Sequence, residues 1–563
     1  MIYHCEDRTC NYWDEGEKLP ERCPQCGRKL LRANETDMTG DDWTALGNTL
    51  WDAEASDKKR MVDCFRKAAY LGSAWGVCNL GICMEQGNGV EADPVQAFWL
   101  YQQAVEMGSL NAVCCLGVCY EYGIGTAPDA EKAAELYCKA AEYGSPRGQM
   151  LLARAFHDGI GVEADAAEAV YWVRAAAYQR YGEGMYRLGV CYEYGDGVEQ
   201  NWEHAVHWFR EAAESGVSVA MAVLGYCYEK GCGVEQSWEQ AFSWYRRGAE
   251  CGNLQSMHNL GWCYEKGCGV EQSWEQAFSW YRRGAECGYP VSMGNLGWCY
   301  KKGHGVEQNW QEAIKWYEQG APCGNLQSMH SLAYCYERGE GVKQNMTEAI
   351  RWYTAAAEGG NADAMHNLGW HYDYGEGVEQ DMKKAICWYE RAAEQNHPAA
   401  MNSLGECYAM GLGVPRDLET AMEWYRRAAE LGEAMADYNM GWHLEQAGKL
   451  SEAYAHYRKA ADGNDDSAWW ALGRFYENGV VVAQDGKEAR CCYETGEKLG
   501  SVKCKMRLAR CKLLGIGGRR AKKAGLDLCR QALELAKESS EKEDYGYEAE
   551  MNLLRRTIAE NES

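Results

Sequence analysis

The sequence predicts an all-α fold, a right-handed helical-repeat solenoid of about fourteen helix-turn-helix repeats with a C-terminal cap helix. The main observation is a Leu-Gly pair that recurs at an interval of 36 residues. This period is typical of proteins that stack pairs of helices, because one pair cannot bury its apolar face alone. The glycine slot is occupied by Gly81, Gly117, Ala153, Gly189, Gly225, Gly261, Gly297, Ala333, Gly369 and Gly405, and less regular copies contain Gly47, Gly441, Gly473 and Ala509.

The copy around Gly261 shows why each repeat predicts two helices. Leu260, Gly261 and Tyr264 have the spacing of the apolar stripe of an amphipathic helix. We expect this first helix to end within residues 266–270, because glycine readily adopts the left-handed conformation that ends a helix. A second helix is expected to begin at Ser273, whose side chain suits the N-cap position.

The repeat has the pattern A-M-x-N-L-G-x-C-Y-x-x-G-x-G-V, followed by A-x-x-W-Y-x-x-A-A. It resembles the Sel-1-like repeat family, a branch of the tetratricopeptide-repeat superfamily, over about residues 40–540. The copies at Gly47 and Gly441 lack Gly-x-Gly-Val, so we expect local changes of curvature there. The resemblance implies an adaptor that holds protein complexes together or presents peptides, and a few members of the family are proposed to be secreted hydrolases.

A short N-terminal module lies outside the register of the repeats, and its four cysteines form two knuckles. Four thiolates suit a tetrahedral metal site, and a segment this short needs a metal to fold. The second knuckle resembles that of rubredoxin-like zinc ribbons, so we predict a small ribbon with structural zinc. A redox iron site and unmetallated cysteines are the alternatives. The predicted ligands are Cys5, Cys10, Cys23 and Cys26.

The predicted domain organisation has three parts: a zinc-ribbon module over residues 1–33, the solenoid over residues 34–540 and a capping helix over residues 541–563. Apolar runs stay well below the roughly 18 to 20 residues that span a bilayer, and the first residues lack a signal-peptide core. We therefore expect a cytoplasmic protein without membrane insertion. The formal net charge of -25 argues against nucleic acid as the main partner.

The chain has 28 cysteines, which raises the question of disulfide bonds. Equivalent positions in stacked repeats lie roughly 8 to 10 Å apart, which is too far for a disulfide. We therefore predict free thiols that act as small buried apolar groups. A secreted, disulfide-stapled protein is the alternative, for which Cys251, Cys287 and Cys323 offer partners in a few copies. The shared slot, two residues after the glycine, holds Cys191, Cys227, Cys263, Cys299 and Cys335.

A candidate partner-binding groove follows from the helical period of the first helices. The residues one and five after the glycine, and two and three before it, share the face opposite the Leu-Gly stripe. In the resembling superhelices this face lines the concave groove. Aromatic rings, amides and cations on one groove suit an extended peptide. The predicted groove consists of Tyr226, Trp262, Trp298, Tyr334, Trp370 and Trp442, with His258, His330, His366, Asn259, Asn295, Asn367, Lys230, Lys266, Lys302 and Arg338.

Structural explanations of these aromatic residues remain open. Residues 227–252 are identical to residues 263–288, so recent duplication explains part of the row, and stacked rings can simply shield one another. Tyr226, Tyr334 and Trp370 favour binding, because they lie in more diverged copies and remain aromatic. A second tryptophan series is interpreted as packing, because it lies beside a core Tyr or Phe at Trp208, Trp244, Trp280, Trp316, Trp352, Trp388 and Trp424.

One stretch of this acidic chain is basic. Residues 503–530 hold ten Lys or Arg, opposed only by Asp527. Such a patch suits an acidic protein, an anionic surface, RNA, or the acidic body of another copy of the chain, which would give self-association. A solvated terminal repeat is the alternative. The patch is represented by Arg519, Arg520, Lys522 and Lys523.

No arrangement of residues predicts catalysis. Ser56-Asp57-Lys58-Lys59 matches S-x-x-K, but the companion motifs of penicillin-binding enzymes are missing, so we regard it as coincidence. The sequence lacks His-Glu-x-x-His, Gly-x-Ser-x-Gly and a nucleotide-binding loop. It therefore predicts a non-enzymatic protein–protein interaction scaffold that binds a peptide or protein segment in the groove. The alternatives are a zinc-ribbon or iron redox protein and a hydrolase of the type proposed for secreted cysteine-rich relatives.

Overall fold

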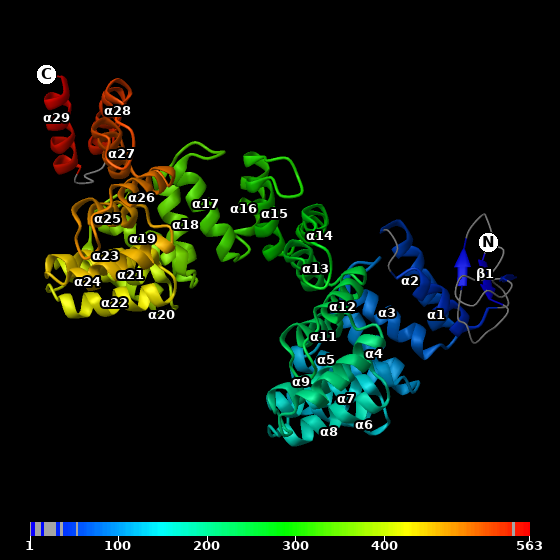
Figure 1. The fold of residues 1–563 in the computed structure, drawn as a ribbon. Helices are drawn as coiled ribbons and strands as arrows, with labels where there is room; N and C mark the ends of the chain where they lie inside the picture. The colour runs from blue at the N-terminus through cyan, green and yellow to red at the C-terminus, as the bar shows by residue number, and fades with distance from the viewer. Residues whose placement is uncertain are drawn as a thin grey trace. The chain divides into compact units, whose positions relative to one another are not determined.

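A computed structural model describes residues 2–5, 13–15, 30–33, 38–51, 55–542 and 547–562 (Figure 1). The chain divides into two compact units, Met1–Cys287 and Gly288–Ser563. Both units are built from pairs of antiparallel helices, in which each first helix packs on its own second helix and each second helix packs on the first helix of the next pair in the unit. The predicted all-α solenoid of paired helices is confirmed for the described part of the chain.

The first unit begins with three short strands, β1 (Ile2–Cys5), β2 (Trp13–Glu15) and β3 (Leu30–Ala33), which form an antiparallel sheet in the order β2-β1-β3. Of the four predicted metal ligands, Cys5 ends β1, whereas Cys10, Cys23 and Cys26 lie outside the described residues. The zinc ribbon therefore stays a prediction.

Seven helix pairs follow in the first unit. Odd-numbered helices are the first helices of the pairs and carry the Leu-Gly slot, and even-numbered helices are the second helices. The helices are α1 (Gly40–Thr49), α2 (Ala55–Tyr70), α3 (Ala74–Gln86), α4 (Pro94–Glu106), α5 (Leu110–Tyr122), α6 (Ala130–Glu142), α7 (Pro146–Asp158), α8 (Ala166–Tyr178), α9 (Gly182–Tyr194), α10 (Trp202–Glu214), α11 (Ser218–Lys230), α12 (Trp238–Glu250), α13 (Leu254–Lys266) and α14 (Trp274–Glu286).

The second unit continues the same alternation and ends with an unpaired helix. Its helices are α15 (Pro290–Lys302), α16 (Trp310–Gly320), α17 (Leu326–Arg338), α18 (Met346–Glu358), α19 (Ala362–Tyr374), α20 (Met382–Glu394), α21 (Pro398–Met410), α22 (Leu418–Glu430), α23 (Ala434–Gln446), α24 (Leu450–Asp462), α25 (Asp466–Asn478), α26 (Gly486–Lys498), α27 (Val502–Leu514), α28 (Lys522–Lys542) and α29 (Glu548–Glu562).

The loop between α13 and α14 shows why Gly-x-Gly-Val recurs. Gly267 ends α13 with a φ of 72°, and Gly269 has a φ of 71°. A Cβ on Gly269 would lie 2.1 Å from the carbonyl oxygen of Trp238, so the second glycine lets the loop approach the start of α12. The Ser273 hydroxyl then caps α14 by accepting a hydrogen bond of 3.3 Å from the Gln276 amide. The predicted helix end and helix start are both confirmed.

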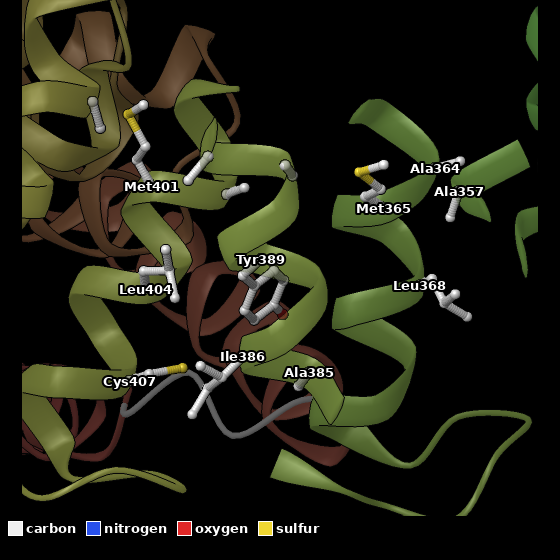
Figure 2. Packing of buried hydrophobic residues seen from close by; sticks show 14 of the residues in the cluster. Ala357, Ala364, Met365, Leu368, Ala385, Ile386, Tyr389, Met401, Leu404 and Cys407 are labelled. Atoms are coloured by element: carbon white, nitrogen blue, oxygen red, sulfur yellow. The ribbon is translucent and has the colours of Figure 1, made fainter. Parts of the chain in front are cut away.

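A tyrosine of the second helix occupies the centre of most repeats. Figure 2 shows Tyr389 on α20 between α19, which carries Leu368, and α21, which carries Leu404. A Cβ on Gly369 would lie 2.7 Å from the ring of Tyr389, which explains the recurring glycine of the first helix. The equivalent buried residues are Tyr101, Tyr137, Tyr245, Tyr281, Tyr317, Tyr353, Tyr425, Tyr457 and Tyr493, with Phe65 and Phe209 in two copies.

Cysteines of the shared slot belong to this core. Cys227, Cys263, Cys299 and Cys335 are fully buried, and Cys191 is half-buried. Burial raises the pKa of the Cys263 thiol to about 12, so it remains protonated at neutral pH. The predicted role as small buried apolar groups is therefore confirmed for four of the five positions. Cys251, Cys287 and Cys323 are exposed.

The C-terminal helix α29 packs on α27 and α28. It buries Met551 and Leu554 against them. Arg507 of α27 binds both carboxylate oxygens of Glu550, at 2.6 and 2.7 Å. A partly buried bidentate ion pair thus fixes α29 to α27. The inner face of α29 therefore takes part in the packing of the last repeat, in addition to capping the solenoid. Among the described helices, none is long and apolar enough to cross a bilayer.

Candidate functional site

Six aromatic residues directly follow the glycine slot of first helices, and we call them the aromatic row. In the first unit, Tyr226 is 45% exposed and Trp262 is half-buried. In the second unit, Trp442 is 44% exposed, and the other three members are half-buried. Each ring therefore contributes both to packing and to accessible surface. The members in the second unit are Trp298, Tyr334, Trp370 and Trp442.

Neighbouring side chains hold these rings in place. The ring centroid of Trp262 lies 5.6 Å from that of Trp238, which begins α12. Trp370 lies 4.9 Å from Tyr374 one turn later in α19. The Lys301 ammonium lies 4.2 Å from the ring centroid of Tyr334, within cation–π distance. Rings that are already supported lose little conformational entropy when a partner covers them.

The row is interrupted at Glu406, which occupies the aromatic slot of α21. Its carboxylate accepts hydrogen bonds from the amides of Asn402, at 3.1 Å, and Asn439, at 3.0 Å. Burial raises the pKa of Glu406, while the two amides favour its charged form. A buried polar cluster therefore replaces an aromatic contact at this point of the second unit.

Below the row, the buried tyrosine of most second helices meets a carboxylate of the paired first helix. The Tyr281 hydroxyl donates a hydrogen bond of 2.8 Å to Glu265, and Tyr353 donates one of 2.7 Å to Glu337. We call this arrangement the tyrosine–carboxylate pair. It recurs as Tyr101–Glu85, Tyr137–Glu121, Tyr245–Glu229, Tyr389–Asp373, Tyr457–Glu445 and Tyr493–Glu477.

The same carboxylates hold three of the cations predicted for the groove. Lys230 lies 2.8 Å from Glu229, and Lys266 lies 2.8 Å from Glu265. Arg338 lies 3.4 Å from Glu337. The cationic side chains are about half exposed, whereas the carboxylates are mostly buried. These cations are therefore held beside the aromatic row, and the carboxylates partly neutralise the positive charge that a partner would meet there. Lys302 is exposed.

In the second unit, polar side chains connect consecutive first helices. The side chain three residues before the glycine slot of one repeat forms a hydrogen bond with the side chain two residues before the glycine slot of the next repeat. The Asn367 amide donates to His330 Nε2 at 3.1 Å, Ser403 lies 3.4 Å from His366 Nε2, and the Asn439 amide donates to Asn402 at 3.0 Å. We call this series the inter-repeat ladder. It engages three of the predicted groove residues, His330, His366 and Asn367.

The three predicted groove histidines contact the buried tyrosines in a tilted arrangement. His258 lies 5.7 Å from Tyr281, and the same centroid distance separates His330 from Tyr353 and His366 from Tyr389. Burial lowers the pKa of His258 and His366 to about 4, and it also lowers the pKa of His330. These imidazoles are neutral at pH 7, so they offer a partner ring surface and no positive charge.

The predicted amides are half-buried. The side chains of Asn259 and Asn367 lie beside the buried Tyr245 and Tyr353, respectively. Asn295 is also half-buried, near Trp298 in the same helix. These amides are therefore partly packed against neighbouring side chains and partly accessible to a partner.

At the C-terminal end, part of the predicted basic patch pairs within the chain. Arg510 of α27 contacts Glu477, and the Arg520 guanidinium donates to Asn561 of α29 at 2.5 Å. Arg519, Lys522 and Lys523 are exposed. Several basic residues thus serve to dock α25 and α29, and the exposed part of the patch is smaller than the sequence suggested.

Sequence reasoning missed two features. The carboxylates of the tyrosine–carboxylate pairs recur four residues after the glycine slot, so their period was the available signal. A cavity of about 550 Å³ between α7, α8 and α9 was also missed. Its signal was a copy that carries Ala153, His157 and Val173 where most copies have glycine, a carboxylate and an aromatic ring.

The family described as Sel1 repeat matches the chain in twelve consecutive segments, which cover well over half of its length. No curated protein sequence matches the chain at a significant level. The matched segments are residues 76–109, 112–145, 146–181, 182–217, 218–253, 254–289, 290–325, 326–361, 362–397, 398–433, 434–465 and 468–501.

Two solved structures were found to be similar to the chain. The crystal structure of c5321, a protective antigen of uropathogenic Escherichia coli with an SLR fold, is 28% identical and has a TM-score of 0.56. The alignment covers 82% of this chain and 94% of that chain. A Sel1 repeat protein from Oxalobacter formigenes is 30% identical, with a TM-score of 0.41, over 43% of this chain and 96% of that chain.

Proposed function

Because the chain belongs to the Sel1 repeat family, we propose that it is a non-enzymatic scaffold that binds a peptide or protein segment on the aromatic row of its first helices. Its fold is typical of protein–protein interaction. The observation that carries the proposal is the row itself, whose rings are partly exposed and supported by fixed neighbours. Supported aromatic side chains are frequent hot spots of protein interfaces.

The chemistry beside the row favours an apolar or aromatic segment of a partner. The neighbouring histidines are neutral at pH 7, and three of the cations are tethered to carboxylates. A strongly acidic ligand would find little uncompensated positive charge here, whereas side chains that stack on rings find several supported surfaces. The amides of Asn259 and Asn367 give the partner polar groups at the edge of the rings.

Comparative partner capture tests the proposal. The tagged wild-type protein and the variant Tyr226→Ala/Trp262→Ala are compared by quantitative mass spectrometry of the captured proteins. A matched control, Trp99→Ala/Tyr143→Ala, removes two rings that are 63% and 68% exposed on second helices or their ends. We expect partners to be lost from the row variant and kept by the control. Equal capture by all three proteins would exclude the row of the first unit as the site.

The second unit has its own members of the row and is tested separately. The variant Trp370→Ala/Trp442→Ala removes one half-buried and one exposed ring from α19 and α23. If a partner depends on only one unit, only the corresponding variant loses it. Circular dichroism and thermal melting of each variant show whether a loss of capture reflects a loss of folding.

A further inference from the structure

In the first unit, α7, α8 and α9 line a half-open cavity of about 550 Å³, which we call the arginine cavity. It lies where the repeat departs from its usual core. The second helix α8 carries Val173 in the slot that holds Tyr137 and Tyr245 in other copies, and valine lacks the ring that fills this space. A volume of this size suits a small-molecule or peptide-terminus site, for which about 300 to 1,000 Å³ is typical.

Both halves of the tyrosine–carboxylate pair are missing from this copy. His157 replaces the carboxylate of the first helix, and Val173 replaces the tyrosine of the second helix. The glycine slot holds Ala153, whose Cβ occupies the position where, in other copies, a Cβ added to the glycine would lie less than 3 Å from the tyrosine ring. Ala153, Val170 and Val173 therefore form an apolar wall of the cavity.

Three arginines also line the cavity, and one of them has no partner among the residues that the structure describes. Arg187 is exposed to solvent and makes no hydrogen bond or ion pair with a described residue. Arg187 lies two residues before Gly189. In the inter-repeat ladder, the residue at this position bonds the residue that lies three before the glycine slot of the preceding repeat. Here that residue is Met150, whose thioether is at best a weak acceptor.

A second arginine is only partly satisfied. Arg154 contacts Glu121 through Nη2 at 2.5 Å, but its buried Nε has no hydrogen-bond partner. Arg147, the third, donates to Asn111 at 2.7 Å. A buried guanidinium N–H without an acceptor is costly, and a ligand oxygen would remove this cost.

The acidic residues of the lining are engaged elsewhere or exposed. Asp158 and Asp196 both contact His157, at 2.6 and 3.2 Å. Glu183 is exposed to solvent. The Nε of Arg154 is therefore a buried donor without an acceptor at the cavity, and the exposed guanidinium of Arg187 lies on the same lining.

We propose that the arginine cavity binds a carboxylate joined to an apolar chain. Arg187 and the Nε of Arg154 receive the carboxylate, because a guanidinium matches its two oxygens, and the wall of Ala153, Val170 and Val173 receives the chain. The site is separate from the aromatic row and does not depend on it. The carboxylate comes either from a free small molecule or from the C-terminus of a peptide.

Calorimetric titration of the full-length protein tests this proposal. Octanoate and octanamide represent the free molecule, and N-acetyl-leucyl-leucine with a free or an amidated C-terminus represents the peptide. We expect saturable binding of at least one carboxylate, with the matching amide at least about tenfold weaker because it cannot form charge-assisted hydrogen bonds. The stronger of the two carboxylates identifies the source. Lack of binding by both, or equal binding of the amides, would overturn the proposal.

Two variants localise the binding. Arg187→Gln should weaken the bound carboxylate about tenfold, whereas the control Arg180→Gln, at an exposed arginine outside the lining, should change nothing. The variant Ala153→Gly/His157→Glu/Val173→Tyr restores the pattern of the other copies, so it should fill the cavity, keep the fold and abolish binding. Undiminished binding by Arg187→Gln or by a folded filled-cavity variant would contradict the assignment.

Discussion

The hydroxyl of the buried Tyr281 donates a hydrogen bond of 2.8 Å to Glu265, which lies sixteen residues earlier in the paired helix. The ring of Tyr281 also covers Gly261, where a Cβ would lie 2.7 Å from it. One side chain thus explains two periodic features, the glycine and the acidic residue four positions after it. Copies that change one of these three residues are natural tests of the arrangement.

The copy around Gly189 lacks the hydroxyl, because its core ring is Phe209. Glu193 occupies the carboxylate slot there, and burial raises its pKa. Phe209→Tyr should supply the missing donor and stabilise the protein by about 1 kcal/mol at pH 7. The gain should shrink as the pH falls through the pKa of Glu193, because the protonated carboxyl is a weaker acceptor. Urea unfolding of the wild type and of Phe209→Tyr at pH 7 and pH 4 measures this gain in unfolding free energy.

The matched control for this prediction is Tyr281→Phe, which removes the donor from an existing pair. It should destabilise the protein at pH 7 by about 1 to 2 kcal/mol, because the mostly buried Glu265 loses a hydrogen bond. A loss of stability in Phe209→Tyr together with no change in Tyr281→Phe would show that the hydroxyl does not matter.

Stability should fall as the pH drops from about 6.5 toward 4. Burial lowers the pKa of His258 and His366 to about 4 in the folded protein, whereas an unfolded histidine titrates near its ordinary value of 6.5. The unfolded state therefore binds more protons in this window, so folding weakens as the pH decreases. His258→Asn/His366→Asn should flatten the dependence of the melting temperature on pH. Replacing the exposed His207 with Asn should leave the slope as it is.

One zinc ion per chain is expected at Cys5, Cys10, Cys23 and Cys26, on the basis of their spacing. Elemental analysis of the purified protein measures the content directly. Replacing Cys23 and Cys26 with Ser should release the metal, while Cys251→Ser/Cys287→Ser, at exposed positions, should retain it. Stoichiometric iron in place of zinc would assign the module to electron transfer.

The exposed remainder of the basic patch should contact an acidic partner. Reversal of Arg519, Lys522 and Lys523 to Glu leaves Arg520 in its hydrogen bond to Asn561, so α29 stays docked. We expect weaker capture of that partner and a smaller salt dependence of its binding. Unchanged capture at low and high salt would identify the patch as a solvated surface.

The sequence alone sufficed to place the helices, because the signals are local. Gly267 and Ser273 end and start helices through their own backbone and side chain, so no long-range information was needed. The tyrosine–carboxylate pairs connect residues of two different helices across a loop. Their partners can be recognised only once the packing of the helix pair is known, although both residue types recur with the repeat.

The surface position of part of the aromatic row was predicted for the same reason. Helical periodicity correctly left the rings of Tyr226 and Trp442 at the surface. It could not show that Lys266 pairs with Glu265 or that Asn367 bonds His330, because these contacts depend on rotamers and on the neighbouring repeat. The arginine cavity was missed because it arises from the absence of a ring at Val173, and a pattern search emphasises the residues that repeat.

Direct titration of a captured partner into Trp262→Ala tests the central claim most directly. Trp262 is half-buried against Trp238, so its loss should cost less stability than the about 3 to 5 kcal/mol of a fully buried aromatic. We predict a loss of at least about 2 kcal/mol of binding free energy, as for an interface hot spot, with a folded variant and with Trp99→Ala unchanged. Wild-type affinity in a folded Trp262→Ala protein would contradict the proposal that the aromatic row binds the partner.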